Sequence, residues 1–350
     1  LAGQKKTAEA VKILETLSKT GDAEYKQRAN LELGSYYLQQ NLISKAKPYL
    51  VTAFDDGKVV NGYSAEAARL LYLVGIAEKD KKSAEKYILW TDEKTEGKDA
   101  DITSSLIIFY FDNNEQSKGT ARYNKAMKST DKAFVSEVNY NVGQYYMTKN
   151  NNAQAKTYLQ KAYTGAPQKV NGAGILLAEI AMSEKNTAQA EKYLTEMNTA
   201  AGGKNTQILG MLGTFYLQKG DATKAEQFLS KAVAAEPKNV EAKVLLLGIY
   251  EMQKNTAKVN STYSQLKSGT PKVTNAQIGT YFAQAGAGDL AVKYLQKSIS
   301  EDKNNEAKVV LGQVYAAAGK KAEAVKVLEE AVKAKVKGAA DVLKQVQSMK

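Results

Sequence analysis

Two residue types are missing from this sequence, cysteine and histidine, and their absence excludes several kinds of chemistry. Without cysteine there is no disulfide and no thiolate nucleophile, and without histidine there is no Ser-His triad and no imidazole base. Zinc sites built from these two residues are excluded as well. Carboxylates and lysine remain as catalytic groups, but no carboxylate pair stands out from the charged helix faces. We therefore expect a protein that is not an enzyme, with no cofactor and no metal, and we nominate no catalytic residue.

Arginine is also scarce: all but three of the 49 basic residues are lysine, although the net charge is +12. Proteins that read nucleic acids rely on arginine for bidentate contacts to phosphates and guanines, so the composition disfavours a nucleic-acid partner. Lysines scattered among acidic residues are typical of a solvated surface. The alternative is an acidic partner or an anionic surface, bound through lysines that concentrate near the end of the chain: Lys326, Lys333, Lys335, Lys337 and Lys344.

Proline occurs only four times, and no run of 18 apolar residues exists. The scarcity of proline, together with abundant Ala, Lys, Leu, Glu and Gln, indicates a mostly helical protein. The absence of a long apolar run excludes a transmembrane helix. With 350 residues the chain exceeds what one hydrophobic core usually organises, so we expect several domains or an array of repeats.

One stretch of the sequence defines a repeating unit of two helices. Its first part combines an aliphatic, a small and an aromatic residue, and its second part carries small and aliphatic residues at i, i+4 and i+7: Leu212, Gly213 and Tyr216, then Ala225, Leu229 and Ala232, followed by Pro237. Between the two parts, Gly220 and Asp221 form a helix stop followed by a helix start. The unit is therefore a helical hairpin.

The same unit recurs along the chain at steps of 32 to 38 residues. The position of Gly213 is taken in the other units by Gly34, Tyr72, Ile108, Gly143, Ala178, Leu247, Gly279 and Gly312. The position of Ala225 is taken by Ala10, Ala46, Ala84, Ala155, Ala190, Ala291 and Ala324, and by Thr120 and Val259 in two less regular units. Small residues at these two positions let helices approach closely. Because one hairpin cannot bury both of its faces, it must stack on a neighbour.

This set of residues, at a spacing near 34, resembles the tetratricopeptide repeat (TPR) family. The resemblance rests on the Leu-Gly, Tyr, Ala, Leu, Ala, Pro pattern and covers nearly the whole chain. It implies an all-α fold, an α-α superhelix (TPR solenoid) of about nine complete helical hairpins plus a leading helix and a C-terminal capping helix.

The predicted organisation is one continuous solenoid: N-terminal repeats over 1–100, an irregular segment over 101–133, C-terminal repeats over 134–337 and the capping helix over 338–350. The first helices are expected to begin near residues 27, 64, 101, 136, 171, 206, 240, 272 and 305. Residues 7–19 match the register of a lone second helix, so the chain is expected to begin inside a repeat, as a fragment would. The capping helix would cover the last apolar face.

The segment 101–133 departs from the pattern. Thr120 and Asn124 stand where Ala and Leu are expected, and the polar stretch 112–119 predicts a longer loop. We interpret the segment as a degenerate repeat; a hinge or docking site between two arrays is the alternative.

Aromatic residues form a ladder on the second helices, one place before the Leu229-like position: Tyr49, Tyr87, Tyr123, Tyr158, Tyr193 and Tyr294, with Phe228 in the same place. We expect them to pack between repeats with the phenol tips at the surface. The alternative is an aromatic stripe for partners.

In TPR proteins the first helices line a concave groove that binds extended peptides or helices. The resemblance therefore places partner-binding positions at the second, fifth, ninth and twelfth residues of each first helix. These groove candidates are Glu137, Tyr140, Gln144, Met147, Ile175, Glu179, Met182, Gln207, Thr214, Leu217, Thr280 and Gln313. Their mixture of small, polar and Met side chains fits a protein or peptide partner recognised by shape. The pair of Lys at the fifth place and Asn at the ninth, with which some TPR proteins grip a carboxylate tail, is absent from all nine hairpins.

The sequence thus predicts a non-enzymatic scaffold for protein–protein interaction or complex assembly, with nucleic-acid or anionic-surface binding as the alternative. A cysteine-free chain with lysine in place of arginine and many Asn, Gln and Thr fits the bacterial cell envelope, in which TPR assembly factors serve exopolysaccharide, pilus or secretion machinery. The start Leu1-Ala2-Gly3 is similar to the residues before the lipid-bearing cysteine of a lipoprotein, but Gln4 stands in that cysteine's place. We expect a periplasmic or outer-membrane-associated protein, with a cytoplasmic one as the alternative; a homo-oligomer is compatible with either.

Overall fold

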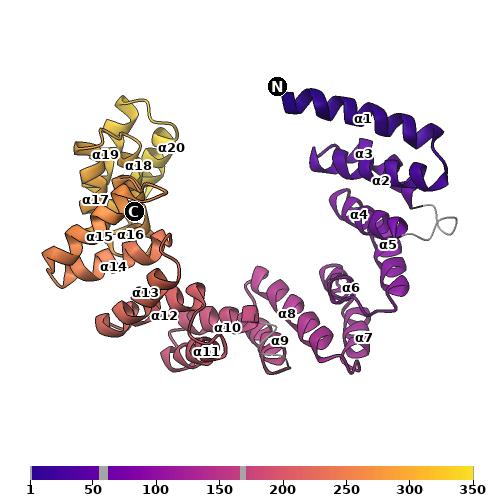
Figure 1. Ribbon diagram of the computed structural model, residues 1–350, viewed down its shortest axis with the longest axis horizontal. Helices are drawn as coiled ribbons and strands as arrows, with labels where there is room; N and C mark the ends of the chain where they lie inside the picture. Colours follow the sequence, from indigo (N-terminus) through magenta and orange to yellow (C-terminus); the bar gives the residue numbers. More distant parts are fainter. Residues whose placement is uncertain (1, 55–61, 166–170, 350) are drawn as a thin grey trace. The chain divides into compact units, whose positions relative to one another are not determined.

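The computed structural model describes residues 2–54, 62–165 and 171–349, which form helices joined mostly by short loops (Figure 1). Twenty helices and no strand occur in these three ranges. The all-α fold class is therefore confirmed. A leading helix is followed by nine helix pairs and a final helix, which confirms the predicted number of hairpins and the two additional helices.

Two compact units divide the chain, Leu1–Ile180 and Ala181–Lys350, and the boundary falls inside α10 (Asn171–Ser183). The first unit holds α1 (Ala2–Thr20), α2 (Ala23–Gln39), α3 (Ile43–Ala53), α4 (Tyr63–Ala77), α5 (Lys81–Lys94), α6 (Ala100–Asp112), α7 (Gln116–Ala126), α8 (Lys132–Thr148) and α9 (Asn152–Gly165). The second holds α11 (Thr187–Ala200), α12 (Thr206–Gln218), α13 (Ala222–Ala235), α14 (Val240–Met252), α15 (Thr256–Ser268), α16 (Asn275–Gln284), α17 (Gly288–Ser300), α18 (Ala307–Ala317), α19 (Lys321–Lys333) and α20 (Ala339–Ser348).

Most first helices begin within three residues of the predicted start, but α2 and α8 begin four residues earlier. In both cases an aspartate one turn ahead of the repeat motif caps the helix. The carboxylate of Asp22 accepts a hydrogen bond from the backbone N–H of Tyr25 at 2.9 Å. The carboxylate of Asp131 accepts from those of Ala133 at 2.9 Å and Phe134 at 3.2 Å. Such a cap satisfies N–H groups that have no partner inside the helix, so it fixes where the helix starts.

Close contact between the two helices of a hairpin explains the recurring glycine. A Cβ atom built on Gly213 would lie 2.4 Å from Cγ of Leu229 on the paired helix. The same clash, at 2.5 to 2.7 Å, would arise in four other hairpins, between Gly34 and Leu50, Gly143 and Leu159, Gly279 and Leu295, and Gly312 and Leu328. The glycine is therefore required by helix separation, because any side chain would push the leucine out of the core.

The third hairpin corrects the predicted register. The buried residues of α7 are Gly119, Tyr123 and Ala126, whereas Thr120 and Asn124, predicted for the first two of these places, are exposed. In this hairpin the small residue at the close contact lies on the second helix, because a Cβ on Gly119 would lie 2.5 Å from the ring of Phe111 on α6. This hairpin thus also contains a close approach that requires glycine, here on the second helix instead of the first.

The longer loop predicted for this hairpin was also wrong. Because α7 begins at Gln116, only residues 113–115 connect the two helices, a three-residue loop like that of the other hairpins. In α6 the side chain of Ile107 is fully buried, and that of the predicted Ile108 is only partly buried. The segment 101–133 lies within the first unit, and its role as a hinge or docking site stays a prediction.

A buried ion pair joins this hairpin to the preceding one. The guanidinium of Arg122 on α7 donates two hydrogen bonds to the carboxylate of Asp92 on α5, at 2.9 and 2.7 Å, and a third to the hydroxyl of Thr103 on α6 at 2.8 Å. The side chains of Arg122 and Asp92 are only 9% and 10% exposed. Gly97 has a positive φ of 63°, and a Cβ there would lie 2.6 Å from the guanidinium. Three helices and their linker thus meet at one bidentate pair.

Aromatic stacking within hairpins accounts for much of the predicted ladder. The aromatic residue of a first helix lies beside that of its second helix in four hairpins, with ring centroids 5.4 to 5.6 Å apart: Tyr37 with Tyr49, Tyr146 with Tyr158, Tyr216 with Phe228, and Phe282 with Tyr294. Such separations are those of favourable aromatic pairs. The expected packing role is therefore confirmed, although it lies within hairpins as well as between them.

Phenol groups also connect successive hairpins through shared carboxylates. Glu191 on α11 accepts from the hydroxyl of Tyr216 on α12 and from the ammonium of Lys219, directly after α12, both at 2.7 Å. Glu251 on α14 does the same for two residues of α17, Tyr294 at 2.8 Å and Lys293 at 2.6 Å. Asp112 and Glu226 carry comparable contacts. The hydroxyl groups of these tyrosines therefore donate hydrogen bonds to carboxylates of neighbouring hairpins.

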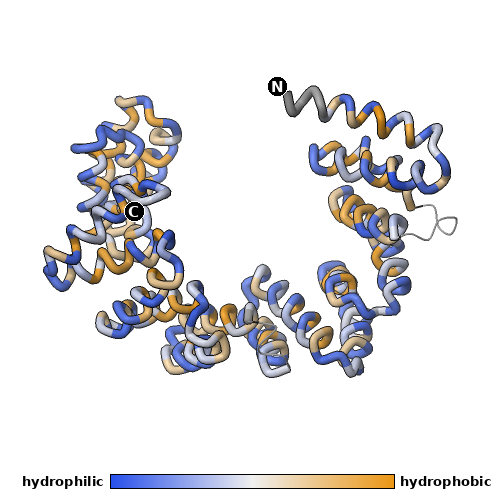
Figure 2. Tube along the Cα trace, viewed as in Figure 1, coloured by the Kyte–Doolittle hydropathy of each residue, from blue (hydrophilic) through white to orange (hydrophobic). Residues whose placement is uncertain are grey.

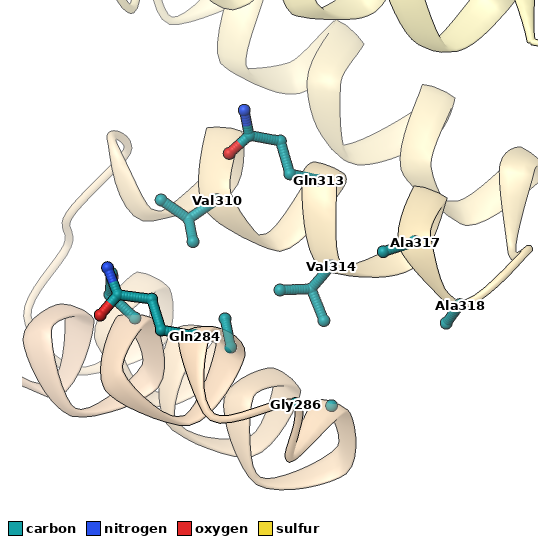
Figure 3. A pocket seen from close by; sticks show the side chains of 10 residues that line it. Gln284, Gly286, Val310, Gln313, Val314, Ala317 and Ala318 are labelled. Carbon is teal, nitrogen blue, oxygen red and sulfur yellow. The ribbon is translucent and has the colours of Figure 1, made fainter. Parts of the chain in front are cut away.

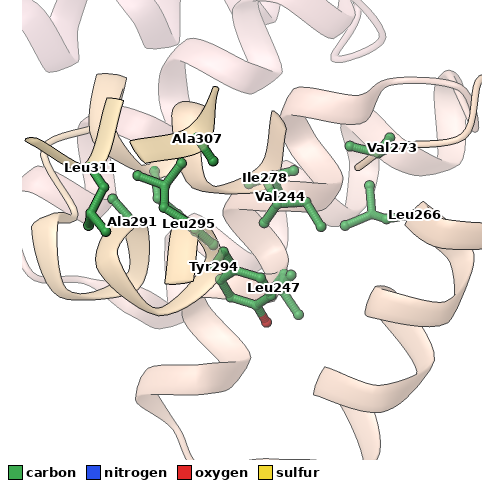
Figure 4. Packing of buried hydrophobic residues seen from close by; sticks show 11 residues of the cluster. Val244, Leu247, Leu266, Val273, Ile278, Ala291, Tyr294, Leu295, Ala307 and Leu311 are labelled. Atoms are coloured by element: carbon green, nitrogen blue, oxygen red, sulfur yellow. The ribbon is translucent and has the colours of Figure 1, made fainter. Parts of the chain in front are cut away.

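The core of the second unit runs continuously across hairpins. Figure 4 shows Leu247, Ile278 and Leu295, which come from different helices, within a cluster that extends to Leu311 on α18. Figure 2 shows apolar and polar residues alternating along the helices, as expected for elements that each bury one face.

The last helix, α20, covers a separate apolar cluster at the end of the array. Val346 on α20 packs with Ala324 and Leu328 of α19. The ammonium of Lys321 donates to the backbone oxygens of Gln347, at 2.9 Å, and Met349 at the end of α20. The predicted capping role of this helix follows from both contacts.

Candidate functional site

All twelve groove candidates lie on first helices, and none is fully buried. Four belong to α8, three to α10, three to α12, one to α16 and one to α18. The structure thus leaves each of these side chains at least partly accessible; their contact with a partner stays a prediction.

The candidates on α8 interact with one another and with their surroundings. The amide of Gln144 donates a hydrogen bond to the hydroxyl of Tyr140 at 3.0 Å. Tyr140 also lies against α10, because a Cβ on Gly172 would be 2.6 Å from its hydroxyl. Partial burial, and then the nearby carboxylates of Asp101 and others, raise the pKa of Glu137. Together with Met147, these residues form a mixed polar and aromatic surface.

The candidates on α10 fall in different units: Ile175 and Glu179 in the first and Met182 in the second. Desolvation by neighbouring atoms raises the pKa of Glu179, although its side chain is largely accessible. On α12, Gln207 is exposed, and Thr214 and Leu217 are partly buried.

The structure brings two candidates, Thr280 and Gln313, together at one cavity between α16 and α18. We call it the α16–α18 pocket; its volume is about 530 Å³. Its lining comprises Thr280, Ala283 and Gln284 of α16, Gly286 of the following turn, Gly288 at the start of α17, and Val310, Gln313, Val314, Ala317 and Ala318 of α18 and its end. Figure 3 shows Val310 and Val314 pointing from α18 toward the segment that carries Gln284. The cavity lies entirely within the second unit.

Small residues at the ends of two first helices create this cavity. Ala283 stands near the end of α16, and Ala317 stands at the end of α18. Both line the pocket, and neither has a side chain long enough to fill it.

The polar groups of the pocket are two amides and one hydroxyl. The hydroxyl of Thr280 donates to the backbone oxygen of Ala276 at 2.9 Å, so its proton is already used. In the part of the chain that the structure describes, the side-chain amides of Gln284 and Gln313 have no hydrogen-bond partner, and both are exposed. No lining residue is ionisable. The site can offer apolar surface and amide hydrogen bonds, but no charge.

Sequence reasoning missed several of these lining residues. Gln284, Val310, Val314 and Ala317 lie just outside the second, fifth, ninth and twelfth places considered for the groove. The signal that could have found them is the coincidence of small residues at the ends of two successive first helices. A second omission is Leu73 and Ile76 on α4, whose side chains are 51% and 46% exposed. They lie one turn apart on one face of a first helix.

The residues that the structure describes contain neither a metal centre nor a membrane-spanning helix. Over 2–54, 62–165 and 171–349, no group of three or more acidic side chains is arranged to hold a metal ion. None of the helices in these ranges combines the length and the apolar character that spanning a bilayer requires.

Solved structures with similar folds include several helical-repeat proteins. One is titled as the functional characterisation of Pseudomonas aeruginosa pilF, with 20% identity over 65% of this chain and 97% of that one, at a TM-score of 0.37. PilW, titled a widely conserved type IV pilus biogenesis factor, shows 16% identity over 63% and 98% at 0.39. Yeast Tom70 shows 11% identity over 93% and 89% at 0.42. These scores are too low to carry an argument about function.

No curated protein sequence matches the chain. Models of the tetratricopeptide repeat do match, over residues 136–169, 206–239 and 277–340. The matched stretches contain the hairpins whose register is most regular, and the same helix pairing continues through the other described hairpins. Residues 136–169, 206–239 and 277–340 are therefore tetratricopeptide repeats.

Proposed function

We propose that this protein is a non-enzymatic scaffold that holds a protein or peptide partner on the surface of its first helices, in complex assembly. Repeat proteins of this kind bind partners through extended surfaces. The observation that carries the proposal is the α16–α18 pocket, because it is a cavity on first helices that contains two residues, Thr280 and Gln313, nominated for partner binding from register alone.

Two further features support this choice over a partner site on the second helices. The aromatic residues of the second helices are occupied by packing against first helices, as with Phe228 on α13 and Tyr294 on α17, and Tyr294 also donates a hydrogen bond to Glu251. By contrast, the first helices keep Leu73 and Ile76 exposed. Exposed apolar residues of this size, next to one another, are typical of interaction surfaces.

We also propose that the protein works in the bacterial cell envelope, in the periplasm or at the outer membrane, in the assembly of exopolysaccharide, pili or secretion machinery. The composition supports this setting: no cysteine, and lysine in place of arginine. Fractionation of the native cells tests it. Recovery of the protein with the periplasmic or outer-membrane fraction is expected, and recovery in the cytosol would overturn this part of the proposal.

Copurification from the native organism, with quantitative mass spectrometry, tests the scaffold function. We would compare the wild-type chain with a first-helix variant carrying Gln144→Lys, Thr214→Lys and Gln313→Lys, and with a matched second-helix variant carrying Gln160→Lys, Gln227→Lys and Gln296→Lys. All six residues are accessible, so both variants should fold. A specific partner that survives the second-helix changes and is lost with the first-helix changes is expected. Loss with the second-helix set instead, or the absence of any specific partner, would contradict the proposal.

A further inference from the structure

We infer that the α16–α18 pocket receives an uncharged, extended segment of the partner, with one aliphatic or aromatic side chain seated between Val310, Val314 and α16. The inference rests on the proposed function and names the partner chemistry at one part of the first-helix surface. Three properties of the pocket carry it: the absence of charge, the small residues of its walls and its two free amides.

The absence of charge selects the side chain that enters. None of the ten lining residues is ionisable, and the walls are mostly Ala, Val and Gly. An ionised side chain placed there would lose hydration without gaining a counter-charge, which is costly. An aliphatic or aromatic side chain gains from leaving water. A neutral apolar residue therefore fits, and an acidic or basic one does not, although the whole chain carries a net charge of +12.

The small residues allow a backbone to approach. Ala283, Ala317 and Gly288 present no bulky side chain to the cavity, and a Cβ on Gly288 would meet no atom within 4 Å. The volume, about 530 Å³, lies in the range of ligand pockets, roughly 300 to 1,000 Å³. Space is therefore available for a side chain together with its flanking backbone.

The free amides match an extended chain. A glutamine amide offers both a donor and an acceptor, the same pair that a peptide group presents. Gln284 lies on α16 and Gln313 on α18, on opposite walls of the pocket (Figure 3). An extended segment keeps its N–H and C=O groups available because it forms no internal hydrogen bonds, whereas a helix uses most of its own. The pair therefore favours an extended segment over a helix.

A displayed library of random 12-residue peptides, selected against the full chain, tests this inference. Selected peptides would be synthesised with a fluorescent label, and their affinity measured by anisotropy. We expect an enriched motif with an uncharged centre and one Leu, Ile, Met or Phe. A motif that centres on a charged residue would overturn the inference.

The decisive variant is Gly288→Leu, which fills the pocket from a position where a side chain meets no other atom. Leucine is also the better helix former, so α17 is expected to persist. The matched control is Thr256→Leu, at the first residue of α15, the same place in the preceding hairpin. We expect Gly288→Leu to weaken peptide binding by about tenfold or more, since side chains that anchor in pockets dominate affinity. The control should change binding less than about twofold, because its side chain is exposed.

The other outcomes separate the inference from the function on which it rests. If Gly288→Leu leaves the peptides bound, or if neutral 1-octanol occupies the pocket while no peptide is enriched, the inference fails. The scaffold proposal then still stands if the native partner copurifies and is lost with the first-helix variant. If neither a native partner nor a peptide is found, both fail.

Discussion

The third and sixth hairpins solve the same packing problem in opposite ways. In the sixth, α12 and α13, glycine lies on the first helix, and a Cβ on Gly213 would strike Leu229 at 2.4 Å. In the third, α6 and α7, glycine lies on the second helix, and a Cβ on Gly119 would strike Phe111 at 2.5 Å. Close approach needs a missing side chain on one helix, and either helix can supply it. Each hairpin therefore contains one close approach that only glycine permits, despite the different motifs.

The exchange in the third hairpin has a consequence for the next repeat. Tyr123 takes the place of the usual leucine, and its hydroxyl donates to Oδ1 of Asn139 on α8 at 2.7 Å. The seventh hairpin repeats the arrangement, with Tyr263 donating to Asn275 on α16 at 2.7 Å. In both, an asparagine stands at the corresponding place of the following first helix. Apparent irregularities of the repeat are thus compensated by a partner one helix later.

The largest expected effect comes from the ion pair that distinguishes the third hairpin. Arg122→Met should lower the free energy of unfolding by about 3–5 kcal/mol, because it leaves the buried carboxylate of Asp92 without a counter-charge. Urea denaturation followed by circular dichroism measures this loss. The control is Arg69→Met, which breaks an exposed pair with Glu66 and should cost less than about 1 kcal/mol. Equal effects of the two changes would mean that Asp92 is hydrated.

The glycine exchange is tested next. Gly119→Ala and Gly213→Ala should each lower the free energy of unfolding by about 1–3 kcal/mol, since the new methyl group overlaps a core side chain. Gly210→Ala, on the same helix as Gly213 but with no atom within 4 Å of the new Cβ, should instead raise it by about 0.5–1 kcal/mol. Thermal denaturation of the wild type and the three variants measures these changes in stability. A stabilising Gly119→Ala would refute the corrected register.

A smaller effect is expected for the tyrosine that replaces leucine. Tyr123→Phe should cost about 1 kcal/mol in the free energy of unfolding, because Oδ1 of the buried Asn139 loses its donor. Tyr263→Phe should behave alike in the seventh hairpin. Tyr25→Phe, at a side chain that is 57% exposed, serves as the control and should leave the denaturation midpoint unchanged. A loss no larger than that of the control would show that these hydroxyl bonds contribute nothing.

The smallest effect is a pH dependence of the third hairpin. Burial raises the pKa of Tyr123 to about 12, above the value of about 10 that applies to the unfolded chain. The unfolded chain therefore loses this proton first, so the stabilisation is complete below pH 10 and is lost as the pH rises from 10 to 12. Urea midpoints at pH 8 and pH 11 should differ less in Tyr123→Phe than in the wild type. If the urea midpoint fell equally in both proteins between pH 8 and pH 11, Tyr123 would not be the cause of the pH dependence.

Much of the fold could be predicted from the sequence because register and periodicity repeat nine times. The small residues and leucines of regular hairpins, such as Gly213 and Leu229, fix both helix faces. The prediction failed at Gly119 because the polar residues around it do not reveal a one-residue shift of the repeat register. The shift becomes evident only from the contact between Gly119 and Phe111. It also failed at the starts of α2 and α8, where Asp22 and Asp131 extend the helix beyond the motif.

The candidate site could be predicted only in part. Register alone placed Thr280 and Gln313 on first helices, and both line the α16–α18 pocket. The pocket itself depends on small side chains, Ala283 near the end of α16 and Ala317 at the end of α18. Ala283 and Ala317 are ordinary helix residues in isolation, so their effect appears only when the two helices are placed side by side.

Site-specific photocrosslinking in the native organism tests the central claim most directly, that the first helices hold the partner. Benzoylphenylalanine would be introduced at Gln313 on α18 and, in a separate strain, at Gln227 on α13, both exposed residues of the second unit. The account predicts a discrete protein adduct from position 313 and none from position 227. An adduct from position 227 alone, or none from either position, would contradict it.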